Sequence, residues 1–161
     1  MSAIRPFNSP LECGLRILFV LNSANGRTAD LQRLIAYDYL LVHSGDVDGP
    51  DSLHPSVPYR GTEFLVKRDV MSIGLNEMFS RELLDKTFDT AGILYRSTKL
   101  TTAFVSLLKS EYANSLRDRA DWVVMRFGDM KDTELSAYMT ASIGKWGAEF
   151  ERLTAINELE L

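Results

Sequence analysis

The sequence has one cysteine, Cys13, among its 161 residues. A single thiol cannot close an internal disulfide or supply the several thiolate ligands of a structural zinc site. Because Cys13 lies in an apolar run, we expect it to behave as a small buried hydrophobe. The scarcity of cysteine argues against a disulfide-stapled secreted fold and favours a reducing cytoplasm.

Long apolar segments are also absent. The longest one, residues 15–21, is interrupted by Arg16 and is far shorter than the roughly 20 residues of a membrane-spanning helix. Residues 1–10 provide no apolar stretch of signal-peptide length. We therefore expect a cytoplasmic protein with no membrane partner.

Positive charge is in short supply. Lysine and arginine number 18 against 22 aspartates and glutamates, which gives a net charge of −4. The molecule as a whole lacks the basic footprint that supplies most non-specific affinity for nucleic acid. Any contact with DNA therefore needs a local basic patch or a partner protein.

Motifs for catalysis and cofactor binding are missing as well. The chain contains no G-x-S-x-G nucleophile elbow, no Walker A loop and no dinucleotide-binding fingerprint. Carboxylates are plentiful, but nothing distinguishes a catalytic pair among them. We predict that the chain is not an enzyme and holds no cofactor.

What is present is the composition of an ordinary globular protein, with 45% hydrophobic and 25% charged residues. A domain of this size buries about 68–70% of the surface that its unfolded chain exposes. We expect a single domain over residues 1–161, with an N-terminal arm at 1–10, a core at 11–97 and a C-terminal helical part at 98–161.

The apolar pattern of the first half predicts helices. Residues 11–23 are apolar on nearly every face, which is typical of a buried core helix. Thr28 is the expected N-cap of a second helix that runs to about residue 43 and lies antiparallel to the first. A third helix follows residues 44–61, and Gly74 can bend or divide it.

Residues 84–96 predict a short β-hairpin with its turn at residues 89–92. The helical period returns from about residue 98 as one long helix or two, and Asp132 or Thr133 caps a last helix that runs to residue 161. A helix pair, a further helix and a hairpin follow one another in a winged helix-turn-helix, where the hairpin is the wing. The expected fold is mainly α with a short β-hairpin: a winged-helix-like core plus C-terminal helices.

Aromatic residues of the C-terminal third have spacings compatible with a buried helix seam: Trp122, Phe127, Tyr138, Trp146 and Phe150. Core packing is the default interpretation. The alternative is that some of them face a partner, because aromatic anchors are enriched at interface hot spots. The sequence leaves both interpretations open.

The residues between His43 and His54 are the one place in the sequence where possible metal ligands gather. An EF-hand counted from Asp46 needs glycine at its sixth position and glutamate at its twelfth, but Asp51 and Val57 stand there. We expect the aspartates to cap turns and the histidines to fix the loop by hydrogen bonds. The candidate structural or interface loop comprises His43, Asp46, His54, Pro55, Tyr59 and Arg60.

A winged helix that reads DNA directly needs a basic third helix and wing. Between residues 60 and 86, five basic residues are balanced by five acidic ones. A mixed, solvated surface is therefore the favoured interpretation. The candidate, weakly DNA-facing basic residues are Lys67, Arg68, Arg81 and Lys86.

Several segments resemble the middle component of bacterial three-component ABC systems. The most distinctive are His-Ser-Gly-Asp at 43–46, Leu-His-Pro at 53–55 and Pro-Tyr-Arg at 58–60. Gly-Ile-Leu-Tyr-Arg at 92–96 and Arg-Ala-Asp-Trp at 119–122 continue the resemblance, which covers nearly the whole chain.

Such systems include the Lamassu type of antiphage and antiplasmid defence. The resemblance implies a helical, winged-helix-like accessory subunit that links an SMC-like ABC ATPase, expected as a dimer, to an effector, often a nuclease. It would regulate the effector when foreign DNA is sensed and meet DNA mainly through the complex. Two alternatives stay open: a winged-helix transcription regulator that binds operator DNA as a dimer, and a small enzyme or metal protein built on the 43–54 loop.

Overall fold

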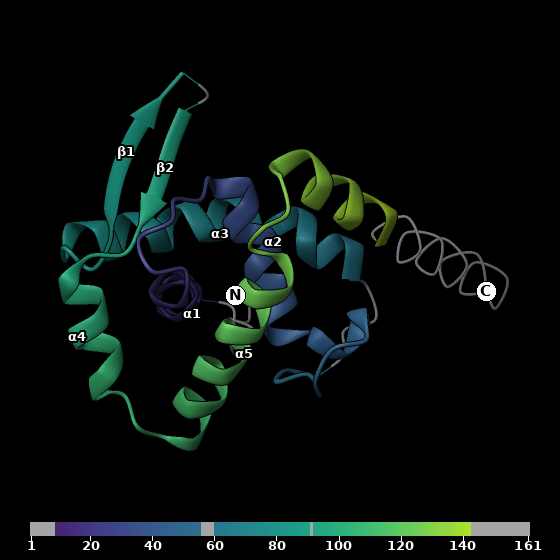
Figure 1. Ribbon diagram of the computed structural model, residues 1–161, viewed down its shortest axis with the longest axis horizontal. Coiled ribbons are helices and arrows are strands. Elements are labelled where there is room, and N and C mark those ends of the chain that lie inside the picture. The colour runs from purple at the N-terminus through teal and green to yellow at the C-terminus, as the bar shows by residue number, and fades with distance from the viewer. Residues whose placement is uncertain (1–8, 56–59, 91, 143–161) are drawn as a thin grey trace, which may run out of the picture.

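The computed structural model describes residues 9–55, 60–90 and 92–142, with side chains described from Lys67 onward in the second range. It is mainly helical with one antiparallel hairpin, as predicted (Figure 1). Residues 132–142 are helical again. The named elements in chain order are α1 (Pro10–Ser23), α2 (Leu31–Val42), the 3-10 turn η1 (Ser44–Val47), α3 (Arg60–Ser80), β1 (Asp85–Asp89), β2 (Gly92–Arg96), α4 (Lys99–Leu107) and α5 (Glu111–Phe127).

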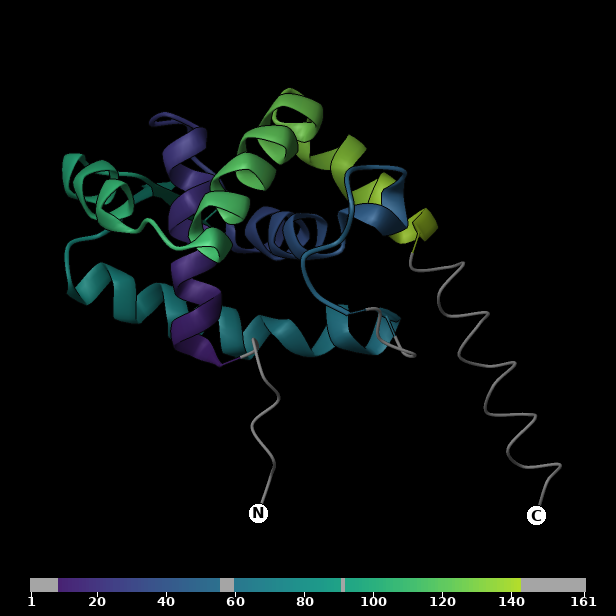
Figure 2. The same ribbon diagram turned by 90° about the horizontal axis from the view of Figure 1, so that it is seen from below.

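Helix α1 is the centre of the molecule. It begins with a capping box, in which Ser9 Oγ accepts a hydrogen bond from the backbone of Glu12 and the Glu12 carboxylate accepts one from the backbone of Ser9. The expectation of a buried core helix is confirmed, because Ile17, Leu18 and Val20 are fully buried. Figure 2 shows α3 and α5 crossing α1 on two sides.

Helix α2 begins at Leu31, and its N-cap is Asp30 rather than Thr28. The reason is that Ala29 exchanges two backbone hydrogen bonds with Tyr95 of β2, at 2.8 and 2.9 Å, which holds the chain extended beyond residue 28. The predicted antiparallel pairing of the first two helices is wrong. Figure 1 looks along the axis of α1 while α2 runs across the picture.

Helix α3 runs through Gly74 without a break, so this glycine does not divide the helix. It allows a close helix crossing instead. A Cβ at Gly74 would lie 2.3 Å from the carbonyl oxygen of Pro10, and one at Gly14 would lie 2.9 Å from the carbonyl oxygen of Gly74. The two glycines therefore let the backbones of α1 and α3 touch.

The hairpin forms where the sequence predicts it, and Phe88 of β1 lies opposite Ile93 of β2. The chain after it makes two helices rather than one, since Thr98 caps α4 and Ser110 caps α5. The order of α1, α2, α3 and hairpin is the one expected of a winged helix-turn-helix. The winged-helix assignment itself stays a prediction.

The last described helix begins at Asp132, before the start that a cap at Asp132 or Thr133 predicts. Its first hydrogen bond runs from the backbone of Leu135 to the carbonyl of Lys131, so Asp132 and Thr133 lie inside the first turn. Phe127 contacts Trp122 and Tyr138 at ring-centroid distances of 5.7 and 5.5 Å, as core packing requires. The expected anchors Trp146 and Phe150 lie outside the described residues.

One hydrophobic cluster of buried side chains extends from Cys13 in α1 to Met139 in the last described helix. Residues on both sides of the expected division at position 97 contribute to it, while the domain division itself stays a prediction. Within the described ranges, no helix is both long and apolar enough to cross a membrane.

The close contact at Gly74 predicts that alanine lowers the stability of the protein, which is opposite to the usual effect of Gly→Ala in a helix. In an open helix, Gly→Ala stabilises by about 1 kcal/mol. Gly74→Ala should instead lower the free energy of unfolding by about 1–3 kcal/mol, because its methyl group forces α1 and α3 apart. Urea unfolding would measure it, with Asp69→Ala at an exposed position of the same helix as the control. A stabilised Gly74→Ala protein would contradict the close crossing.

Candidate functional site

The loop after α2 is closed by hydrogen bonds within itself. Ser44 Oγ donates to the carbonyl of Pro50 at 2.8 Å. The backbone of Gly45 donates to Ser52 Oγ at 2.9 Å. The backbone of Leu53 then returns to the last turn of α2, where it donates to the carbonyl of Val42 at 3.0 Å. These hydrogen bonds close the loop on itself and attach its end to α2.

Three of the candidate loop residues, His43, Asp46 and His54, make contacts within the protein. His43 and His54 are 2% and 7% exposed. The Tyr39 hydroxyl donates to the Asp46 carboxylate at 2.8 Å, and His54 Nε2 lies 2.6 Å from the Tyr112 hydroxyl. In the described part of the chain, no three His, Cys, Asp or Glu side chains gather as a metal site requires.

The remaining loop candidates contribute less. Pro55 is exposed, and Tyr59 lies outside the described residues. Arg60 is the first residue of α3, but its side chain belongs to the part that is not described. The structure therefore brings His43, Asp46 and His54 into one hydrogen-bonded region and leaves the other three untested.

Helix α5 holds this loop from the outside. The Arg119 guanidinium donates twice to the carbonyl of Asp51, at 2.8 and 3.1 Å. The indole of Trp122 lies on Gly49, where a Cβ would come within 2.4 Å of the ring. A side chain at Gly49 would displace the indole, so the loop, α5 and the Trp122 ring form one packed unit.

A buried ionic cluster lies beneath the loop. Asp38 of α2 is fully buried, and Arg16 of α1 donates to its two oxygens from Nε and Nη2 at 2.7 and 3.0 Å. Lys67 of α3 approaches from the other side, with Nζ 2.9 Å from Asp38 Oδ2. Three helices therefore meet at one carboxylate.

The cluster controls which buried groups are charged. Burial alone would raise the pKa of Asp38, but Arg16 and Lys67 outweigh it and hold that pKa well below its usual range. Burial raises the pKa of the Cys13 thiol to about 11. Burial, aided by the positive charge of Arg16, lowers the pKa of His54 to about 4. At neutral pH, Asp38 is ionised, while Cys13 and His54 are uncharged.

The expected DNA-facing residues do not form a patch. Lys67 is 3% exposed and belongs to the buried cluster, so the prediction that it faces DNA is wrong. Arg68 and Arg81 are exposed, and Lys86 is half-buried. Arg68 lies in α3 and Arg81 directly follows the last residue of that helix, Ser80, so the 13 positions between them correspond to about 20 Å along the helix axis.

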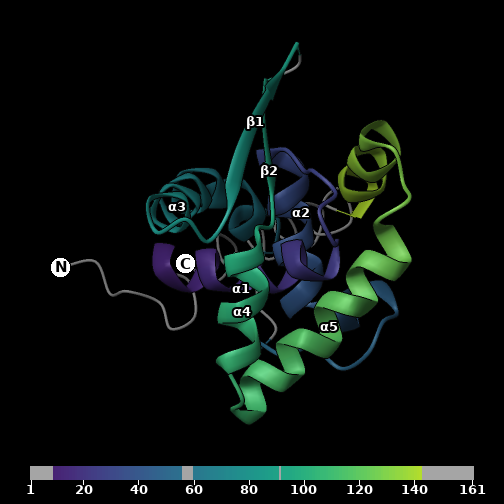
Figure 3. The same ribbon diagram turned by 60° about the vertical axis from the view of Figure 1, so that its left-hand side comes forward.

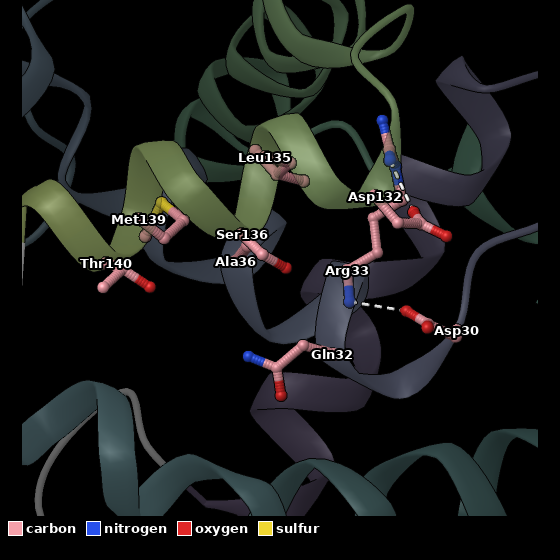
Figure 4. A pocket seen from close by; sticks show the side chains of 9 residues that line it. All are labelled: Asp30, Gln32, Arg33, Ala36, Asp132, Leu135, Ser136, Met139 and Thr140. Carbon is pink, nitrogen blue, oxygen red and sulfur yellow. Dashed lines mark hydrogen bonds and ion pairs between the residues drawn. The ribbon is translucent and has the colours of Figure 1, made fainter.

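Arg33 joins the end of α5 to α2. Its guanidinium donates to the Tyr37 hydroxyl and to the Asp132 carboxylate. It also donates to three carbonyls at and just after the end of α5, those of Phe127, Gly128 and Met130. Cations favour this position because helix carbonyls there have no partner within the helix. Figure 4 shows Arg33 with Asp132 on one side and Asp30 on the other, beside a small pocket of about 90 Å³.

The sequence reasoning missed the ionic cluster and the Arg33 clamp. A signal for the cluster exists, because Arg16 interrupts an otherwise apolar helix and Asp38 lies among the apolar residues of the next one. Charges in such positions are normally paired when buried. No comparable pattern marks Arg33, whose acceptors are mostly backbone carbonyls.

Comparison with known families identifies the chain. A family model described as ABC-three component (ABC-3C) system Middle Component 2 matches residues 6–149. Because the match covers most of the chain, the protein belongs to this family, and the resemblance seen in the sequence is confirmed at this level. No curated protein and no solved structure matches the chain.

Neutralising Asp38 tests the ionic cluster. Asp38→Asn leaves Arg16 and Lys67 buried without a counter-charge, so we expect the free energy of unfolding to fall by about 3–5 kcal/mol. Denaturant unfolding would measure it. Asp129→Asn, which removes the partner of Arg27 at a 98% exposed site, should leave stability nearly unchanged. Equal effects of the two substitutions would contradict the buried network.

His54 makes stability depend on pH. Because its pKa falls from 6.5 in the unfolded chain to about 4 in the fold, the unfolded state takes up the proton first as pH drops. Neutral His54 therefore contributes about 1–3 kcal/mol to the free energy of unfolding. This contribution is complete above about pH 6.5 and is lost as the pH falls through 4. His54→Gln should flatten the stability profile between these pH values in thermal unfolding. If the stability of the His54→Gln protein depends on pH as strongly as that of the wild type, His54 is not the cause of the pH dependence.

Proposed function

We propose that this member of the Middle Component 2 family is a non-catalytic cytoplasmic subunit that bridges the ATPase and the effector of its ABC system. The ATPase is an SMC-like ABC protein that acts as a dimer, and the effector is a nuclease. The complex serves Lamassu-type defence, in which sensing of foreign DNA by the ATPase releases or positions the effector. Different contacts of the subunit in two states of assembly supply the switch.

One observation carries the proposal: large apolar side chains are exposed at two opposite ends of the molecule. Phe88 and Ile93, which face each other across the hairpin, are 76% and 41% exposed. Leu107 at the end of α4 is 76% exposed. Figures 1 and 3 show the hairpin and the α4–α5 connection pointing in opposite directions. Exposed apolar patches of this kind mark protein contacts, and two of them suit a bridge.

The face formed by α3 and the hairpin favours protein over DNA. Phe79 of α3, whose ring lies next to Lys86 of β1, adds an apolar side chain that is 42% exposed. Lys86 of β1 is already engaged, since its Nζ donates to Asn76 Oδ1 at 2.9 Å and lies 4.4 Å from the centre of the Phe79 ring. This face supports the bridging role better than the operator-binding alternative.

The first experiment is co-expression of the tagged chain with its neighbouring genes, followed by native mass spectrometry of the purified material. We expect a complex that contains an ATPase and an effector. Phe88→Asp should reduce recovery of one component about tenfold, the loss typical of an aromatic interface anchor. Met125→Asp on α5, at a methionine that is 79% exposed, is the matched control and should leave the complex intact.

Two outcomes would count against the bridge. Recovery of the wild-type chain alone, with tight binding to one specific DNA duplex, would establish the transcription regulator instead. Loss of the same component from the Phe88→Asp and Met125→Asp proteins would mean that exposed charge, rather than the hairpin surface, disrupts assembly. Circular dichroism spectra of both variants should match the wild type, because neither side chain is buried.

A further inference from the structure

An apolar groove of about 420 Å³ lies between α1 and the α4–α5 connection. Its walls are formed mainly by aliphatic and aromatic side chains, with Leu15 and Phe19 from α1 on one side and Leu107 at the rim of the other. Leu11, one turn before Leu15, is 47% exposed and extends the apolar face of α1. The groove is open to solvent, although the side chains around it are those of a protein core.

The groove is held in shape by polar contacts behind its walls. Arg117 donates to the carbonyls of Val105 and Leu108 at 3.0 and 2.9 Å, which fixes the end of α4 and presents Leu107 outward. Tyr112, which lines the groove, is held by its hydroxyl 2.6 Å from His54 of the loop. A preformed groove loses little conformational entropy when a ligand enters it.

The charges of the groove differ in sign from those of the whole chain. The ionisable side chains that line it with full charge are Arg16, Lys109 and Glu12, which leaves an excess of one positive charge. Lys67 and Asp38 behind the wall cancel each other, whereas the chain as a whole has a net charge of −4. A carboxylate is therefore favoured at this groove and disfavoured over much of the remaining surface.

We infer that the groove receives an amphipathic helix from another subunit of the complex, with an apolar face for Leu15, Phe19 and Leu107 and an acidic residue placed against Lys109. Helices in grooves of this kind insert apolar side chains at intervals of three and four residues. The inference rests on the proposed bridging role and specifies the chemistry of one of its two contacts. Nucleic acid does not fit, because the walls are apolar and the groove carries only one excess positive charge.

A photo-crosslinking amino acid in place of Leu107 identifies the occupant in the co-expressed complex. We expect crosslinks to a helical segment of a second subunit that carries leucine-type residues and an adjacent aspartate or glutamate. Crosslinks to another copy of this chain, to its own residues 1–8 or 143–161, or to a segment without acidic residues would overturn the assignment.

Charge substitutions test the same contact independently. Leu107→Asp should weaken recovery of the crosslinked subunit about tenfold or more, and Lys109→Glu should weaken it several-fold. Lysine in place of the crosslinked acidic residue should then restore binding to the Lys109→Glu protein. Met125→Asp is again the control, because Met125 is exposed to a similar extent on α5 but does not line the groove.

The outcomes separate this inference from the proposal on which it rests. If the wild-type complex forms and Leu107→Asp leaves every component in place, the groove is not the contact, while the bridge stands. If neither an ATPase nor an effector is recovered with the wild-type chain, the proposed bridging role is wrong. The inference about the groove, which depends on that role, is then wrong as well. If the lysine substitution in the partner does not restore binding to the Lys109→Glu protein, no acidic residue of the partner contacts Lys109.

Discussion

The buried carboxylate of Asp38 is the interaction on which the interior of this protein depends. It is fully buried, and a charge in that position is tolerated only when opposite charges and hydrogen bonds surround it. Its two cations come from different helices, Arg16 from α1 and Lys67 from α3. Sliding either helix by one turn, about 5.4 Å, would leave a charge buried without its partner. The cluster therefore allows one mutual placement of the three helices and penalises neighbouring ones, whatever its net contribution to stability.

The glycine crossing and the ionic cluster act on the same pair of helices. The contact of Gly14 with Gly74 brings the backbones of α1 and α3 together. On α1 this contact lies two residues before Arg16, and on α3 it lies seven residues, about two turns, after Lys67. Close packing fixes the distance between the helices, and the paired charges fix their register. From this base, the Tyr112 hydroxyl and Arg119 attach α5 to the loop that follows α2. The surfaces at the two ends are thus carried by a single rigid core.

The sequence predicts those parts of the fold that depend on local pattern. The buried first helix, the hairpin with its turn and the helical second half follow from periodicity and turn residues. The errors arise where distant residues decide the structure. Ala29 pairs with Tyr95 and so moves the start of α2, and Gly74 meets Gly14 rather than breaking its own helix. Lys67 has the sequence context of a surface residue, and only the position of Asp38, 29 residues earlier in the chain, shows that it is buried.

Several cations of this acidic chain are used inside the fold rather than on its surface. Several arginines and lysines are directed inward: Arg16 and Lys67 bind Asp38, Arg33 caps α5, and Arg117 and Arg119 donate to backbone carbonyls. Arg16 and Lys67 together exceed the charge of Asp38 by one. The other three arginines stay charged, but their guanidinium groups are bound to backbone carbonyls, so these cations hold the fold together and do not gather into one exposed basic patch. The net charge of −4 disfavours the approach of a phosphate backbone to the chain as a whole. Apolar contacts do not depend on that charge, and Phe88 and Leu107, at the two ends of the molecule, are both exposed enough to make them.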